Sequence, residues 1–203
     1  MDADPVEIRV LGCLIEKQRT TPDVYPLSLN SLRLACNQST NRDPVVQYDE
    51  PTIRHALDSL SRRGWARLAS GPGSRAVKFR HLFDEALGLD DGEISLLAVL
   101  MLRGPQTLGE LKQRTERLHR FETAGEVDAV LSALAQRELV EQSPRRPGQK
   151  EDRFVQLLGE SAESAPPPAT DTVEEDRLAQ LETAVGELRD EVAALRAELR
   201  GLG

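Results

Sequence analysis

Cysteine and histidine are scarce in this chain of 203 residues. Cys13 and Cys36 are its only cysteines, and each falls within an apolar helical pattern. We therefore expect two buried, reduced thiols, with a redox sensor as the less favoured alternative. The three histidines are scattered, and neither they nor the cysteines have the spacing of a zinc-binding sequence. The sequence thus argues against a zinc domain, and we expect no metal and no cofactor.

Aromatic residues and long apolar runs are also scarce. Aromatics make up 3% of the chain, against 30% charged and 39% hydrophobic residues, which is typical of small helical domains rather than of a large β-protein. The acidic N-terminus has no apolar run long enough for a signal peptide or a membrane span, so we expect a cytoplasmic protein that does not enter the membrane. No nucleophile elbow, phosphate-binding loop or metal ligand set occurs, which argues against an enzyme.

The net charge of −8 is unevenly distributed along the chain. Residues 1–82 carry a net charge of +3, residues 83–158 carry −4, and residues 159–203 carry −7. Only the first of these segments has the sign expected of a protein that binds a polyanion such as nucleic acid.

The first 82 residues predict three helices followed by a β-hairpin. Apolar residues at helical spacing indicate helices over residues 5–20, 28–36 and 50–63. Short strands are expected at residues 65–69 and 76–80, around a Gly-Pro-Gly-Ser turn. Helix, turn, helix, turn, helix and hairpin is the order of a winged helix-turn-helix, so we predict a first winged-helix domain over residues 1–82.

The same order recurs in the next segment. Helices are expected from about residue 89 to 103, over residues 107–115, where Thr107 and Glu110 form a capping box, and around residues 127–139. Strands at residues 139–142 and 153–157 complete a second hairpin. We therefore predict a second winged-helix domain over residues 83–158 and a mostly α (α+β) fold with two tandem winged helix-turn-helix domains.

The C-terminal segment has a different composition. Residues 159–173 are rich in Pro, Ala and Ser and predict a disordered linker, and residues 174–200 carry the heptad pattern of a coiled-coil helix. The predicted dimerisation seam consists of Leu178, Leu181, Val185, Leu188, Val192, Leu195 and Leu199. Valine at two a positions with leucine at every d position favours a parallel homodimer. The alternative is a single amphipathic helix that folds back on the winged-helix domains.

A dense polar string interrupts the helices of the first segment. Its parts are Leu11-Gly12, Glu16-Lys17, Thr20 to Asp23, Tyr25 to Asn30, Ala35 to Gln38 and Asn41 to Val45. This string closely resembles the YceH family, an uncharacterised group of bacterial proteins built from two winged-helix domains. The resemblance implies the tandem winged-helix fold and brings no biochemical activity with it. The chain departs from the family pattern at Ser39-Thr40, where a lysine followed by a serine is expected, so a basic residue is missing from this turn.

In a winged helix, the third helix enters the major groove of DNA and the hairpin contacts the backbone. The residues that we expect to contact DNA are Asn41, Arg42, Arg54, His55, Ser59, Arg62, Arg63, Arg75 and Lys78. The alternative is that the arginines form an ordinary solvated face and that the asparagines only cap helices and turns.

The functional hypothesis is a DNA-binding protein or transcription regulator that acts on double-stranded DNA through the first domain. The second domain would be an interaction module, because its third helix carries Glu126 and Asp128, which have the wrong sign for phosphates. The alternative is a protein–protein interaction adaptor that uses winged helices as docking folds and does not bind DNA.

Overall fold

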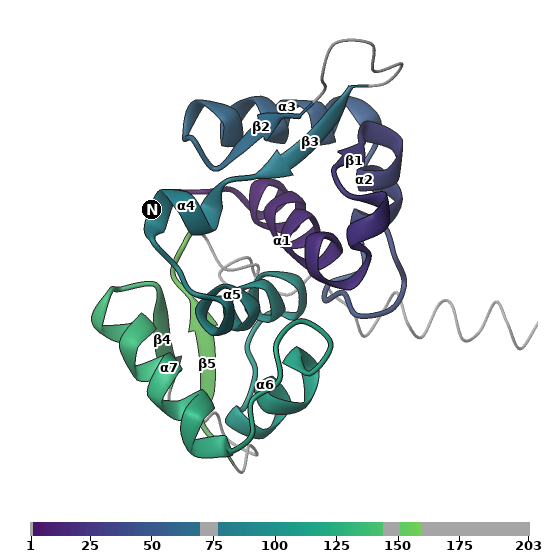
Figure 1. The fold of residues 1–203 in the computed structure, drawn as a ribbon. Coiled ribbons are helices and arrows are strands. Elements are labelled where there is room, and N and C mark those ends of the chain that lie inside the picture. Colours follow the sequence, from purple (N-terminus) through teal and green to yellow (C-terminus); the bar gives the residue numbers. More distant parts are fainter. Residues whose placement is uncertain (1, 70–76, 144–150, 160–203) are drawn as a thin grey trace, which may run out of the picture. The chain divides into compact units, whose positions relative to one another are not determined.

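The computed structural model describes residues 2–69, 77–143 and 151–159 (Figure 1). It is a mixed α/β structure with seven α-helices and small antiparallel sheets among these residues. The elements of the first half are α1 (Pro5–Thr20), the short 3-10 helix η1 (Pro22–Val24), β1 (Leu27–Ser28), α2 (Leu29–Cys36), α3 (Glu50–Arg62), β2 (Ala66–Leu68) and β3 (Lys78–His81). Those of the second half are α4 (Phe83–Leu87), α5 (Asp91–Arg103), α6 (Leu108–Thr115), α7 (Ala124–Gln136), β4 (Val140–Ser143) and β5 (Arg153–Gln156). The six helices and two strand pairs expected from the sequence are confirmed.

Side-chain caps explain where the helices begin. At α1, the carboxylate of Asp4 accepts a hydrogen bond of 2.8 Å from the backbone N–H of Glu7, and the Glu7 carboxylate accepts one from the N–H of Asp4. At α3 there is one such bond, because the carboxylate of Asp49 accepts a hydrogen bond of 2.9 Å from the backbone N–H of Thr52. The predicted capping box of Thr107 is present at α6. These bonds satisfy backbone N–H groups that have no partner inside the helix.

Each hairpin has a third partner that the sequence pattern does not indicate. In the first half the sheet order is β1-β3-β2, and Leu27 of β1 pairs with Phe79 of β3. In the second half β4 pairs with β5, and Gln106 forms an antiparallel bridge with Phe154 of β5. Leu27 and Gln106 each lie one residue before the N-cap of a short helix, α2 or α6. The two halves therefore repeat a strand contact as well as an order of elements.

Helices α1 and α5 lie side by side and share one hydrophobic core (Figure 1). Every residue from Glu7 to Ile15 in α1 and from Gly92 to Leu102 in α5 is buried. A helix that is buried on all sides over such a length packs against more than one neighbour. The backbone also joins the two halves, because the N–H of Ala3 donates to the carbonyl of Leu158 over 3.1 Å. The predicted boundary at residue 82 stays a prediction, and the core continues across it.

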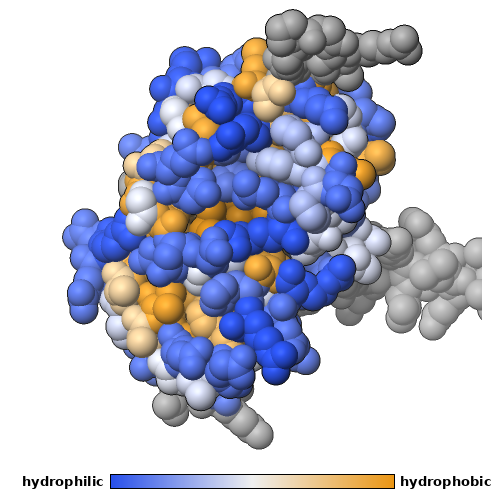
Figure 2. Space-filling model, viewed as in Figure 1, coloured by the Kyte–Doolittle hydropathy of each residue, from blue (hydrophilic) through white to orange (hydrophobic). Residues whose placement is uncertain are grey.

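Several sequence predictions lie outside the described residues. They are the linker beyond residue 159, the coiled-coil helix with its seam from Leu178 to Leu199, and Arg75 of the first hairpin. Within the described ranges, no helix combines the length and apolarity needed to cross a membrane. Hydrophilic residues surround smaller apolar patches on the face drawn in Figure 2.

Candidate functional site

Helix α3 separates an apolar face from a polar one. Ile53, Ala56, Leu57 and Leu60 are buried, while Arg54, His55 and Arg62 are exposed and Ser59 is half-buried. Among the described residues, no side-chain hydrogen bond or ion pair engages Arg54, His55 or Arg62. Two guanidinium groups and an imidazole thus lie free on one helix face, where they can donate to phosphates or to base edges.

Arg63 lies next to this face but has other partners. Its Nη2 donates to the backbone carbonyl of Asp2 over 2.7 Å and lies 3.6 Å from Oε2 of Glu7. Its guanidinium also lies 5.5 Å from the ring centre of Trp65, within the range of a cation–π interaction. Arg63 therefore ties the end of α3 to the start of α1, which is a packing role.

The first hairpin carries another of the predicted DNA contacts, Lys78. Lys78 is half-buried and pairs in register with Ser28. Arg67 of β2 is exposed, whereas Arg80 of β3 forms an ion pair with Glu85. The hairpin therefore contributes Arg67 as an exposed cation.

The predicted DNA contact of Arg42 requires correction. Its side chain is fully buried, and each of its five N–H donors has an acceptor inside the protein. Both oxygens of Glu16 accept from it, at 2.6 and 3.1 Å, and the other three acceptors are the carbonyls of Ala35 and Asn41 and the side-chain oxygen of Gln38. A guanidinium held in this way has no donor left for a phosphate. Arg42 is an internal ion-pair residue.

The ion pair also sets the charge state of Glu16. Burial is the largest single influence on the pKa of Glu16 and raises it, but the hydrogen bonds and charge of Arg42, together with Lys17, outweigh burial and lower this pKa below its usual value. Glu16 is therefore ionised at neutral pH, and its charge is balanced by Arg42.

Asn41 points to the second half rather than to the outer face of α3. Its backbone has a φ of 60°, a left-handed conformation that asparagine adopts more readily than most residues. Its side-chain oxygen accepts a hydrogen bond from Arg103 at the end of α5. The structure thus moves Asn41 from the predicted DNA interface to a contact between the two halves.

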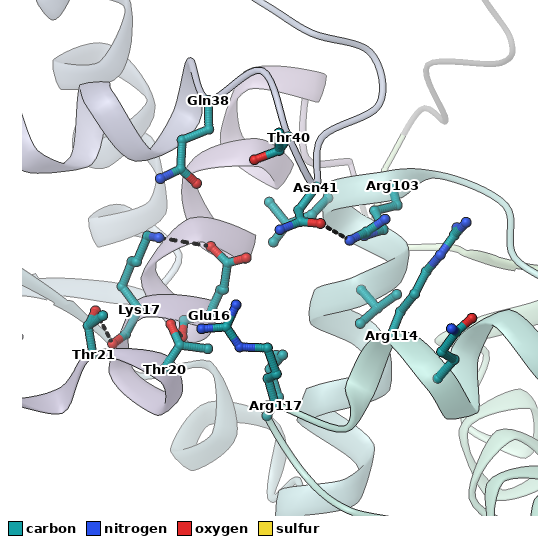
Figure 3. Close-up of a pocket in the computed structure, with 14 residues that line it drawn as sticks. Glu16, Lys17, Thr20, Thr21, Gln38, Thr40, Asn41, Arg103, Arg114 and Arg117 are labelled. Atoms are coloured by element: carbon teal, nitrogen blue, oxygen red, sulfur yellow. Dashed lines mark hydrogen bonds and ion pairs between the residues drawn. The ribbon is translucent and has the colours of Figure 1, made fainter.

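A pocket of about 570 Å³ opens at this contact (Figure 3). One wall comes from the second half of α1 and the turn after α2, and the other from the end of α5 and from α6 with the residues that follow it. Its charged lining residues are Glu16, Lys17, Arg103, Arg114 and Arg117. Four cations and one carboxylate make the pocket basic, although the chain as a whole has a net charge of −8.

Helix α7, which holds the place of α3 in the order of the second half, presents no comparable cationic face. Helix α7 buries Val127, Leu131 and Leu134, and it exposes Glu126 and Asp128. This face carries negative charge where α3 carries positive charge. The described residues also contain no group of three or more His, Cys, Asp or Glu side chains placed to hold a metal ion.

Cys13 and Cys36 are buried and free, as expected from the sequence. The hydrogen bond between the two thiols, together with burial, holds the pKa of Cys36 well above its usual value. Because the thiolate is the reactive form, this environment makes Cys36 a poor nucleophile.

Residues 3–149 match the family described as "Protein of unknown function, DUF480". This chain belongs to the DUF480 family. Among its relatives, each described as a UPF0502 protein, that of Dechloromonas aromatica is 47% identical over 202 residues, covering 96% of this chain and 92% of the relative. The relative from Pelobacter propionicus is 49% identical over 201 residues, covering 94% and 91%. That from Geotalea daltonii is 52% identical over 169 residues, covering 80% and 77%.

The residues that match DUF480 include both α3 and the pocket. The exposed residues of α3 follow from helical periodicity, which separates its two faces. The pocket was not predicted from the sequence, because its walls come from residues 16–41 and 99–118, which are far apart in the chain. The sequence did contain one indication of the pocket. The dense polar string includes polar residues that a helix-turn-helix does not require, and four of them line the pocket: Glu16, Lys17, Gln38 and Asn41.

Proposed function

We propose that this protein binds double-stranded DNA through α3 and acts as a dimeric transcription regulator. The observation that carries the proposal is the outer face of α3, where Arg54, His55 and Arg62 are exposed and engage no other described residue. Cations without internal partners are the groups that neutralise phosphates and read guanine edges.

The proposal includes two winged-helix domains, one in each half. It is supported by the repeated order of three helices and a strand pair, and by the equivalent contacts of Leu27 with Phe79 and Gln106 with Phe154. In each half, a residue just before the second helix pairs with the last strand, within a three-stranded sheet in the first half and as an isolated bridge beside a two-stranded sheet in the second. We also infer that the DUF480 family is the one that the dense polar string resembles under the name YceH.

The contact set of the proposal differs from the one predicted from sequence. Arg54, His55, Ser59 and Arg62 would face the major groove, and Arg67 would lie along the backbone with the hairpin. Lys78 and Arg75 belong to the same hairpin and stay in the predicted set. Arg42, Asn41 and Arg63 leave the set because their side chains have the internal partners described above.

The predicted coiled coil supplies the dimer in this proposal. Two copies of α3 would then meet two half-sites on the DNA, whose spacing follows from the symmetry of the dimer. The adaptor function is the second candidate, and the acidic face of α7 favours it because acidic side chains repel phosphates.

The test is fluorescence anisotropy of a labelled random-sequence duplex with the full-length protein across a salt series. We expect the logarithm of the affinity to fall with the logarithm of salt, by about 0.9 for each neutralised phosphate. The test variant is Arg54→Ala combined with Arg62→Ala. Each of the two arginines that contacts a base edge should cost about 10-fold to 100-fold in affinity when it is replaced. Each that neutralises a phosphate should reduce the salt slope by about one.

Arg120→Ala is the matched control, because Arg120 is also exposed but lies after α6, paired with Glu122 at 3.6 Å. It should bind the duplex as the unchanged protein does. Unchanged binding by the α3 double variant would reject α3 as the interface. Absence of binding at low salt by the unchanged protein would reject DNA binding and leave the adaptor function.

A further inference from the structure

The basic pocket contains more positive charge than its own carboxylate balances. Two of its charged residues are already paired: Oε2 of Glu16 lies 2.6 Å from Nη2 of Arg42, and Nη2 of Arg114 lies 3.2 Å from Oε1 of Glu110. Lys17, at 3.5 Å, shares the already paired Glu16, and Arg103 has the neutral side chain of Asn41 as its partner.

Arg117 is the third cation in excess. It is exposed, and no hydrogen bond or ion pair joins its side chain to another residue in the described part of the chain. Figure 3 shows Arg117 reaching towards Glu16 and Thr20 from the opposite wall of the pocket. With Lys17 and Arg103, it leaves a local excess of three positive charges.

The surroundings of Arg103 also disfavour its positive charge. Burial is the main cause of the lowered pKa of Arg103, and the charges of Arg114 and Arg42 add to it. A dianion placed among Lys17, Arg103 and Arg117 would stabilise their positive charges and accept hydrogen bonds from two guanidinium groups and an ammonium group.

The neutral lining shows what kind of dianion fits. Thr20, Thr21, Thr40, Gln38 and Gln113 are neutral hydrogen-bonding residues of the pocket. The hydroxyls of Thr20 and Thr21 donate to the backbone carbonyls of Glu16 and Lys17, so towards a ligand they act as acceptors. The oxygen of Gln38 accepts from Arg42, which leaves its NH₂ group as a donor. None of the lining residues is aromatic, so the pocket offers no platform on which a nucleotide base could stack. Its volume of about 570 Å³ exceeds that of a bare phosphate ion and lies in the range of small-molecule sites.

We infer that this pocket binds a small, hydroxyl-rich phosphate monoester, with the phosphoryl group held by Lys17, Arg103 and Arg117. The phosphoryl oxygens accept from the two guanidinium groups and the ammonium group. The hydroxyl groups of the ligand body meet the threonine and amide side chains. Binding at this pocket does not depend on the proposed function of α3, since the two sites share none of these residues.

The experiment is isothermal titration calorimetry of the full-length protein in phosphate-free buffer at low ionic strength. The probe is glucose 6-phosphate, with glucose and inorganic phosphate as comparison compounds. We expect glucose 6-phosphate to bind at least tenfold more tightly than either comparison compound, because each of these makes only part of the contacts. Arg117→Ala should weaken its binding by about tenfold or more, the effect of removing one hydrogen bond to a charged group.

The matched control is Arg120→Ala, which removes an exposed arginine three residues away that does not line the pocket. It should bind glucose 6-phosphate as the unchanged protein does, and Arg117→Lys should restore part of the affinity that is missing in Arg117→Ala. Because the side chain of Arg117 has no described partner, its replacement should leave the thermal unfolding temperature unchanged, and this is measured in parallel.

Three results would overturn the inference. They are no binding of glucose 6-phosphate, equal binding by Arg117→Ala, and equal affinity for inorganic phosphate, which would reject the hydroxyl-rich body. If Arg117→Ala instead weakens duplex binding while glucose 6-phosphate does not bind, the pocket is a nucleic-acid contact. In that case the phosphate-ester site is wrong, although DNA binding itself stands.

Discussion

Replacement of Arg42 by alanine should destabilise the protein strongly. The arginine side chain is fully buried, and the carboxylate that it holds is 13% exposed. Removing one partner of a buried ion pair leaves an uncompensated buried charge, which costs about 3–5 kcal/mol. Arg42→Ala also removes the donors that satisfy the carbonyls of Ala35 and Asn41. Because the whole free energy of unfolding of a domain is about 5–15 kcal/mol, this single change should remove a large part of it.

Urea unfolding followed by tryptophan fluorescence measures this effect. Trp65 is the only tryptophan, it is buried, and it packs edge-on against Phe83, so its emission should change when the core opens. The exposed Arg54 provides the control, since Arg54→Ala should change the free energy of unfolding by less than about 0.5 kcal/mol. The double variant Glu16→Leu with Arg42→Met should be more stable than Arg42→Ala alone, because it leaves no unpaired charge.

An unfolding free energy for Arg42→Ala within about 0.5 kcal/mol of the unchanged protein would refute this reasoning. Such a result would mean that the guanidinium is not buried in solution. If the same variant then bound a DNA duplex more weakly, Arg42 would return to the predicted set of DNA contacts. Stability and duplex binding of this one variant therefore decide between its internal and its DNA-facing position.

Two further predictions concern buried positions. Burial lowers the pKa of His81 from the usual 6.5 to about 4, so the unfolded chain takes up a proton there before the folded protein does. The stability that neutral His81 provides is complete above pH 6.5 and is lost as the pH falls towards 4. In urea unfolding we therefore expect the free energy of unfolding to decrease by about 2 kcal/mol between pH 7 and pH 5. The variant His81→Gln should show a flatter pH profile. Gly12→Val should destabilise the protein by about 1–3 kcal/mol, because a Cβ at this position already lies 3.0 Å from Leu102 and Met101 of α5. Gly109→Ala is the control, because a Cβ at Gly109 meets nothing within 4 Å and alanine favours a helix over glycine by up to about 1 kcal/mol. If both variants lowered the free energy of unfolding equally, tight packing between α1 and α5 would be contradicted.

Local signals in the sequence were sufficient for most helices. The caps at Asp4, Asp49 and Thr107 act on backbone groups three residues away, so they can be recognised without tertiary structure. The polar face of α3 follows from helical periodicity in the same way. Helix α4 and strand β1 were not predicted, because five and two residues are too short to show a period.

The sequence by itself therefore determined the order of the main helices and hairpins, the two buried thiols and the face that α3 turns away from the core. Only the tertiary structure shows that Arg42 and Asn41 bind partners inside the protein, because these partners, Glu16 and Arg103, lie 26 and 62 positions away in the chain. It alone also assembled the basic pocket from two distant segments. The physical reason is that periodicity and capping report contacts within a few residues, whereas burial of a charged side chain depends on which distant groups the packing of α1 against α5 brings to it.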